Sequence, residues 1–323
     1  MFENLNATVQ RVRFRAVEPL TLPEYKGSTF RGALGHAFRQ VACALRRQEC
    51  DGCMLRERCA YSVCFETPVP AATTVMRKYT KAPHPFVLEP PPDTRRDFEP
   101  GEELVATLIL VGRAQEHLAH FIYAFDEMAR NGLGIQRRKA ELLGLDAAWP
   151  PGNTQPIYNA AEERLLGTPK PVQCEDIQSR VRELHGKPLR LTFETPVRIN
   201  LDGRLSKSAE MAALLPSLLR RLSLLNYFHC GASFETDVRP LLDSGRDVKN
   251  LRSKIFWKDW TRYSTRQETL MEFGGFIGWA EYPPLPDELL QALAWGEILH
   301  LGKASAFGLG KYNIAPQSVP ALS

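Results

Sequence analysis

Residues 299–312 read LHLGKASAFGLGKY, and this stretch carries more information about the fold than any other part of the chain. Three of its residues are glycine and two are lysine, and an apolar segment typical of a strand follows. Glycine reaches positive φ and allows close backbone approach without steric cost, as a loop around a ligand requires. The two lysines indicate a polyanion as that ligand. The alternative is a glycine-rich hairpin that packs and binds nothing.

Two familiar glycine motifs are excluded. The phosphate loop of NTPases needs Gly-Lys-Ser/Thr after a four-residue gap, and Gly302-Lys303-Ala304 lacks the hydroxyl that would hold magnesium. A dinucleotide-binding fingerprint must open a βαβ unit, and only 13 residues follow Gly310.

Apolar periodicity in the rest of the chain predicts a mixed α and β protein. In the first half we expect strands at 7–18 and 104–111, a helix that starts near Ser28 or Thr29, and another at 115–131. A proline-rich and charged stretch, 150–188, contains the expected domain junction. The second half repeats the order, with strands at 189–193, 254–263 and 269–280 and helices at 206–227 and 287–297. Both halves are compatible with a βαββαβ, ferredoxin-like domain.

The first predicted helix has two distinct faces. Its apolar face holds Phe30, Leu34, Ala37, Val41 and Leu45, and its opposite face holds His36, Arg39, Gln40, Cys43 and Arg47. A histidine titrates near neutral pH, so beside arginines it could serve as a general acid or base. The alternative is a surface histidine that supports a turn at Gly35 or bonds into a domain interface.

Five of the seven cysteines lie within residues 43–64. The pair Cys50-x2-Cys53 has the knuckle spacing of structural zinc sites. Cys43 with Cys59, or Cys59 with Cys64, would complete a tetrahedral set. Four cysteinates also hold iron–sulfur clusters, but nothing in the sequence indicates redox chemistry, so zinc is favoured. Scattered reduced thiols are the remaining alternative.

The composition is that of a globular protein of about two domains, with 323 residues, 44% hydrophobic residues and a net charge of +4. No apolar run approaches the roughly 20 residues that span a bilayer, and the N-terminus does not have the pattern of a signal peptide. We therefore expect a cytoplasmic protein without a membrane partner.

Two further basic clusters are candidates for nucleic-acid contact. One is Arg137-Arg138-Lys139, and the other is the segment 249–263, where Lys254 and Lys258 alternate with Phe256 and Trp257. Basic and aromatic residues in alternation suit phosphate contacts combined with base stacking. An edge strand kept soluble by lysine is an equally good explanation.

Beyond the glycine loop, four segments are similar to sequence motifs of one protein family: GSTFRGALGH at 27–36, PHPFVLEPP at 83–91, LRRLSLL at 219–225 and GGFIG at 274–278. With these segments the chain resembles the RAMP superfamily of CRISPR-associated proteins, and within it the endoribonucleases that process CRISPR precursor RNA. The resemblance runs from the first helix to the last strand.

The resemblance implies an α+β fold of tandem ferredoxin-like (βαββαβ, RRM-like) domains with an inserted cysteine-rich zinc loop. We expect one domain at 1–168, with its metal loop at 43–64, and a second at 169–323, with its glycine-rich loop at 302–310. The implied function is metal-independent cleavage of CRISPR repeat RNA to mature crRNA. The alternative is a non-catalytic, crRNA-binding RAMP subunit of an effector complex.

The resemblance also assigns residues. A catalytic histidine near the first helix matches His36, with Tyr25 and Lys26 just upstream as assisting groups. The RNA-binding set implied by the loop and the basic clusters is Arg31, Arg39, Arg137, Arg138, Lys254, Lys258, Lys303, Gly308, Gly310 and Lys311. Relatives favour Cys43, Cys50, Cys53 and Cys59 as the zinc ligands. Repeat RNA and other Cas subunits are the expected partners.

Overall fold

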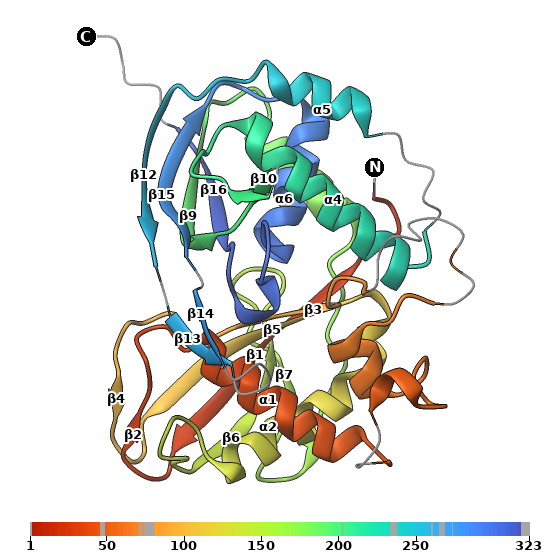
Figure 1. Ribbon diagram of the computed structural model, residues 1–323, viewed down its shortest axis with the longest axis vertical. Coiled ribbons are helices and arrows are strands. Elements are labelled where there is room, and N and C mark those ends of the chain that lie inside the picture. The colour runs from red at the N-terminus through yellow and green to blue at the C-terminus, as the bar shows by residue number, and fades with distance from the viewer. Residues whose placement is uncertain are drawn as a thin grey trace. The chain divides into compact units, whose positions relative to one another are not determined.

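The computed structural model describes residues 2–45, 49–70, 73, 81–201, 203–232, 238–259, 261–264, 269–272 and 274–317. It is a mixed α+β structure with several antiparallel sheets, which confirms the predicted fold class at that level (Figure 1). The chain forms two compact units. We call residues 4–172 with 224–232 the N-terminal unit, and residues 1–3, 173–223 and 233–323 the C-terminal unit.

The N-terminal unit is built on a six-stranded sheet in the order β3-β5-β1-β6-β7-β8, with antiparallel neighbours. Its strands are β1 (Ala7–Ala16), β3 (Phe86–Glu89), β5 (Glu103–Val111), β6 (Ala140–Ala147), β7 (Pro156–Asn159) and β8 (Arg164–Leu165). Its helices are α1 (Gly27–Ala42) and α2 (Leu118–Asn131), and β2 (Leu20–Thr21) pairs with β4 (Asp97–Phe98).

The core of this unit follows from the alternation of β1. Val12 and Phe14 are fully buried, whereas Arg11 and Arg13 on the other face are half-buried. The Phe14 ring meets Phe30 of α1 edge-on, with ring centres 6.0 Å apart. Since successive residues of a strand face opposite sides, one face of the sheet packs against helices.

Helix α1 departs from its predicted limits at both ends. It starts at Gly27, and neither Ser28 nor Thr29 caps it; the N-cap residue is Lys26, with no side-chain capping bond. Phe30, Leu34 and Ala37 are buried as predicted, and so is Phe38, which the prediction missed. Val41, in the last turn, is 39% exposed, and Leu45, which is 42% exposed, lies beyond the end of the helix at Ala42.

The C-terminal unit has a four-stranded sheet in the order β12-β15-β9-β16, again with antiparallel neighbours. These strands are β9 (Leu189–Val197), β12 (Arg252–Lys258), β15 (Gly275–Tyr282) and β16 (Tyr312–Pro316). The helices are α3 (Cys174–Leu184), α4 (Met211–His229), α5 (Arg239–Arg246) and α6 (Asp287–Leu299). Two small hairpins are β10 (Asn200–Leu201) with β11 (Arg204–Leu205), and β13 (Thr261–Ser264) with β14 (Thr269–Glu272).

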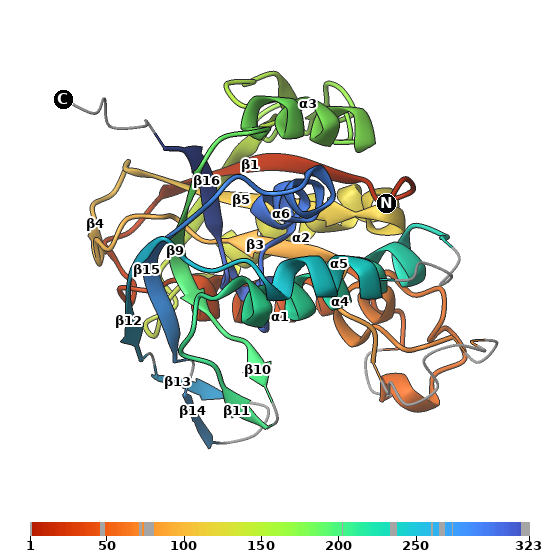
Figure 2. The same ribbon diagram turned by 90° about the horizontal axis from the view of Figure 1, so that it is seen from above.

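Helices α4 and α6 lie on one face of this sheet (Figures 1 and 2). The strand predicted at 254–263 is two strands, because β12 ends at Lys258 and β13 begins at Thr261. The end of α4 and the residues after it, 224–232, group with the N-terminal unit, so this helix contributes to both units. Among the helices described, none is long and apolar enough to cross a membrane.

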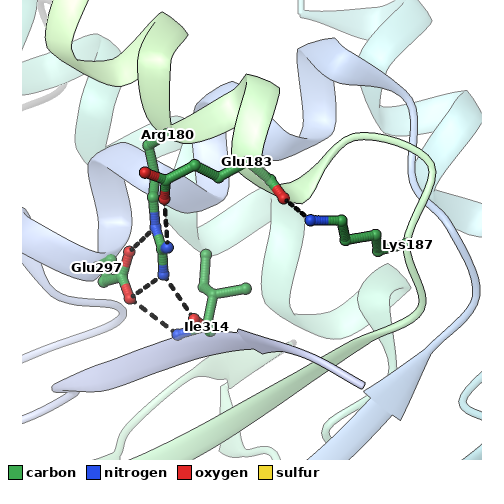
Figure 3. A network of polar contacts seen from close by, with 5 residues as sticks. All are labelled: Arg180, Glu183, Lys187, Glu297 and Ile314. Atoms are coloured by element: carbon green, nitrogen blue, oxygen red, sulfur yellow. Dashed lines mark hydrogen bonds and ion pairs between the residues drawn. The ribbon is translucent and has the colours of Figure 1, made fainter. Parts of the chain in front are cut away.

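Helix α3 is fixed to the C-terminal unit by a polar network (Figure 3). Arg180 Nε donates to Glu297 Oε2 of α6 at 3.2 Å, and Arg180 Nη2 donates to the carbonyl of Ile314 in β16 at 2.6 Å. Glu297 also accepts from the Ile314 amide at 2.9 Å. One guanidinium thus joins a helix that follows the unit boundary to the helix and strand that flank the glycine loop.

Candidate functional site

His36 lies in the middle of α1 with its side chain exposed, and the buried residues of the helix are on its other side. Arg39 is one turn further along and half-buried, with its guanidinium carbon 5.8 Å from the centre of the Tyr61 ring. Residues three apart on a helix are neighbours on its surface. The helix therefore carries His36 and Arg39 on the same side, with the Arg39 guanidinium over the Tyr61 ring.

Arg31 lies one turn before Gly35 and packs on aromatic rings. Its guanidinium carbon is 4.3 Å from the centre of the Phe65 ring and 5.3 Å from that of Phe86. Gly35 is inside the helix, so His36 does not support a turn there. A Cβ atom at position 35 would lie 2.8 Å from Arg31 Nη1, so glycine gives this arginine room to cross the helix surface.

Tyr25 and Lys26, just before α1, are poorly placed to exchange protons. Lys26 is fully buried, and its Nζ donates to the carbonyl of Asp93 at 2.6 Å and to its carboxylate at 3.2 Å. Burial, assisted by the charge of Glu89, raises the pKa of Tyr25 far above its usual value. The phenol thus stays protonated at neutral pH and cannot serve as a base.

The cysteine loop follows α1. Cys43, Cys50, Cys53 and Cys59 are half-buried, and the Cys53 amide donates to the Cys50 carbonyl at 3.2 Å, as in a compact turn. Burial and the charge of Glu66 raise the pKa of Cys50, and the thiols of Cys43 and Cys59 add to this effect.

A set of four thiols has the chemistry of a structural zinc site. Among the described residues, however, no three histidine, cysteine or acidic side chains converge closely enough to hold a metal ion. Cys64 is enclosed, and burial raises the pKa of its thiol to about 12. A zinc site therefore stays a prediction.

The glycine loop folds back on the end of β9. The carbonyl of Arg198 accepts from the Lys303 amide at 2.8 Å, and that of Pro196 accepts from the Gly310 amide at 3.0 Å. At Gly310, with φ +77°, a Cβ atom would lie 1.8 Å from the Leu301 carbonyl oxygen. Close approach to neighbouring backbone is thus one reason for glycine here.

The amides of Gly308 and Gly310 were expected to contact RNA, but both are engaged within the loop and its support. The Gly308 amide donates to the Ser305 carbonyl at 2.8 Å. Lys303 is exposed, and Lys311 Nζ lies 3.7 Å from a carboxylate oxygen of Glu194. Any contact of this loop with RNA would therefore be made by the side chains of Lys303 and Lys311 rather than by those two amides.

The remaining basic candidates lie on separate elements. Arg137 and Arg138 are exposed in a tight loop that pairs Leu133 with Arg138. On β12, Lys254 is exposed and Lys258 is half-buried. The predictions missed Arg190 of β9 and Trp279 of β15, whose side chains stack 4.3 Å apart. The alternation of apolar residues in these two strands was the only available signal.

Two protein-family models match the chain, one in each half. Residues 191–312 match the family model described as CRISPR-associated endoribonuclease Cas6, and residues 5–170 match a family model described as an N-terminal domain. An uncharacterized protein of Archaeoglobus fulgidus is 23% identical over 298 residues, covering 91% of this chain and 92% of that protein.

Solved structures share the fold. A Cas6 product complex matches with a TM-score of 0.58 and 15% identity, over 96% of this chain and 100% of that one. Thermus thermophilus Cas6 matches with a TM-score of 0.56 and 13% identity, over 96% and 99% of the two chains. A partial Cas6-RT-Cas1–Cas2 complex matches at 0.59 and 13% identity; this chain is covered to 98% but spans only 47% of that longer chain.

The fold and the family match across the glycine loop make the chain similar to the CRISPR-associated proteins that process precursor crRNA. Within that class it is similar to the Cas6 endoribonucleases, whose family model matches residues 191–312. This confirms the resemblance found in the sequence.

Proposed function

We propose that this chain is a metal-independent endoribonuclease that cuts CRISPR repeat RNA and releases mature crRNA. The observation that carries the proposal is the exposed His36 on the polar face of α1, one turn before Arg39. The match of residues 191–312 to the Cas6 endoribonuclease family model supports RNA processing in general.

The proposed reaction uses the substrate's own 2′-hydroxyl as the nucleophile. A base removes its proton, the oxygen forms a bond to the adjacent phosphorus, and the bond from phosphorus to the 5′-oxygen breaks. An acid then protonates the departing 5′-oxygen. The products are a 2′,3′-cyclic phosphate and a 5′-hydroxyl, and an imidazole in either role contributes about 10²–10⁴ in rate.

Arg39, beside His36, would offset the negative charge that develops on the phosphate. Arg31 would bind RNA nearby while its aromatic contacts hold it in place. Tyr25 and Lys26, predicted as assisting groups, would help by positioning the start of α1 rather than by proton transfer, because Lys26 is bonded to Asp93 and burial raises the pKa of Tyr25. Catalysis would then depend on His36.

We also propose that the two units are tandem ferredoxin-like domains of the RAMP type, with the boundary near residue 168. Support comes from the chain order, β1-α1-β3-β5-α2-β6 in one unit and β9-α4-β12-β15-α6-β16 in the other. Both sheets place the four corresponding strands in the same spatial order.

For the loop at 43–64 we propose a structural zinc held by Cys43, Cys50, Cys53 and Cys59. Support for this ligand set comes from the Cys50-x2-Cys53 spacing, with Cys43 and Cys59 on either side of it in the sequence. Metal analysis of purified protein should give about one zinc per chain, and less in Cys50→Ser and Cys53→Ser. Wild-type protein without bound metal would contradict the proposal.

RNA contacts are proposed for Arg137, Arg138, Lys254, Lys258, Lys303 and Lys311, and for the backbone around Gly308 and Gly310. Repeat RNA is the proposed substrate, other Cas subunits are proposed partners, and the cytoplasm is the proposed location.

A non-catalytic crRNA-binding subunit is the competing function. It is favoured by the state of the two groups predicted to assist His36, because Lys26 is bonded to Asp93 and burial raises the pKa of Tyr25.

The test is cleavage of a labelled repeat RNA from the source organism's own array, in excess EDTA. Wild type should cut, and His36→Ala should lose about 10²–10⁴ in rate while its binding of the RNA persists. His185→Ala is the matched control, because His185 is an exposed histidine of the C-terminal unit, paired with Asp287. Tight binding by wild type without cleavage would favour the non-catalytic function.

A further inference from the structure

The sheet of the C-terminal unit has one face against helices and one face without a helix in the described part of the chain (Figures 1 and 2). Leu191, Phe193, Ala280 and Tyr312 are buried on the helix side. On the opposite side, which we call the open face, the alternate residues are Arg190, Thr192, Lys254, Phe256, Ile277 and Trp279.

Strand register sets two aromatic side chains close together on the open face. Trp279 of β15 is directly opposite Lys254 of β12 and Thr192 of β9. Phe256 is opposite Ile277, which makes it the diagonal neighbour of Trp279. Diagonal neighbours are about 7–8 Å apart. Phe256 is 55% exposed, so its ring is available to a ligand.

An ion pair between Arg190 and Glu281 links two strands of this surface. The Arg190 guanidinium carbon is 4.3 Å from the centre of the Trp279 ring, and Arg190 Nε donates to Glu281 Oε1 at 3.0 Å. Arg252 Nε donates to the other oxygen of the same carboxylate at 2.7 Å. Glu281 is only 3% exposed, so the three strands are tied together beneath the aromatic rings.

The charge of the open face selects a polyanion. Its described residues include five cations, Arg190, Arg252, Lys254, Lys258 and Lys311, and two carboxylates, Glu194 and Glu281. Both carboxylates are already paired with cations of the same face. Aromatic rings between cations match a ligand that alternates flat bases with phosphates.

We propose that the open face binds unpaired RNA, with successive bases stacked on Phe256 and Trp279 and a phosphate held by Lys254, while Arg190 stays stacked on Trp279 and paired with Glu281. A base within a duplex has both faces covered by its neighbours, so it cannot stack on these rings. The proposal rests on the proposed function, because it takes RNA as the substrate, and it adds that an unpaired segment of that RNA is held by this sheet.

The strand register also places Phe256 and Trp257, which were predicted to act together, on opposite faces of the sheet. Trp257 was expected to stack on bases with Phe256, but adjacent residues of a strand face opposite sides. Trp257 Nε1 donates to Asp259 Oδ1 at 2.6 Å, and Lys207 Nζ lies 5.4 Å from its ring. Trp257 thus serves as a control on the same strand.

The test measures the Kd of fluorescein-labelled octauridylate, a single strand without repeat sequence, by fluorescence anisotropy. Phe256→Leu and Trp279→Leu keep apolar bulk and remove the ring, and each should raise the Kd about tenfold or more. Trp257→Leu should stay within about twofold of wild type. Thermal unfolding of each variant checks that the protein remains folded.

A Kd unchanged within about twofold in folded Phe256→Leu and Trp279→Leu would overturn the proposal. So would tighter binding of a blunt RNA duplex than of octauridylate, or displacement of octauridylate from this face by an oligoglutamate peptide at equal concentration. Cleavage of repeat RNA is measured separately. If the variants of the open face bind octauridylate as wild type does while repeat RNA is still cut, only the open-face proposal is contradicted. If octauridylate binding depends on Phe256 and Trp279 but repeat RNA is not cut, only the proposed nuclease function is contradicted.

Discussion

Glu281 illustrates how one side chain organises the C-terminal sheet. Its carboxylate is almost closed off from solvent and accepts hydrogen bonds from Arg190 and Arg252, one from each neighbouring strand. Burial alone would raise its pKa, but these two guanidinium groups outweigh burial and hold the pKa below its usual value near 4.5. The ionised form is therefore the one that the fold stabilises.

That shift predicts a pH dependence of stability. The contribution of Glu281 is fully present above the pKa of the unfolded chain, near 4.5, and is lost as the pH falls through the lower folded pKa. Glu281→Gln should lower the free energy of unfolding by roughly 1–3 kcal/mol at pH 7. Urea unfolding should show this gap closing from about pH 4.5 downward. A gap that stays constant, or widens in acid, would contradict this account.

At the scale of elements, the glycine loop is shaped by backbone packing. Gly310→Ala would place a Cβ atom 1.8 Å from the Leu301 carbonyl oxygen in a residue with φ +77°. We expect the free energy of unfolding to fall by more than about 2 kcal/mol, because clash is added to the roughly 1–2 kcal/mol of left-handed strain. Chemical denaturation measures this.

Gly186→Ala is the matched control for that substitution. Gly186 also has positive φ, +68°, but a Cβ atom there would meet nothing within 4 Å. It should show the conformational strain without the clash. Equal losses at both positions would mean that close packing does not explain the glycine at 310.

Local patterns explain which elements could be predicted. The apolar residues Phe30, Leu34 and Ala37 recur with helical spacing, so α1 could be predicted from its own sequence. The alternation along β12 separates Phe256 from Trp257, but which of the two lies beside Trp279 depends on pairing with β15. That pairing is set by residues distant in the sequence, so the sequence alone could not reveal it.

At the scale of the molecule, the order of elements in both halves was predictable, and so was the similarity to the Cas6 endoribonucleases. The contribution of residues 224–232 to the N-terminal unit was not, because no local signal marks the point where a helix passes from one unit to the other. The candidate site was predictable in part: His36 is exposed as expected, whereas the burial of Lys26 reflects a partner, Asp93, 67 residues away.

The central claim is that RNA cleavage uses the substrate's 2′-hydroxyl, and a single atom tests it. Repeat RNA carrying one 2′-deoxynucleotide at the cut site is incubated with wild-type protein in excess EDTA, beside the all-ribose RNA, and binding of both is measured. We predict that the ribose substrate is cut to a 2′,3′-cyclic phosphate and that the deoxy substrate is bound equally well but stays intact. Cutting of the deoxy substrate at the same position would contradict the account.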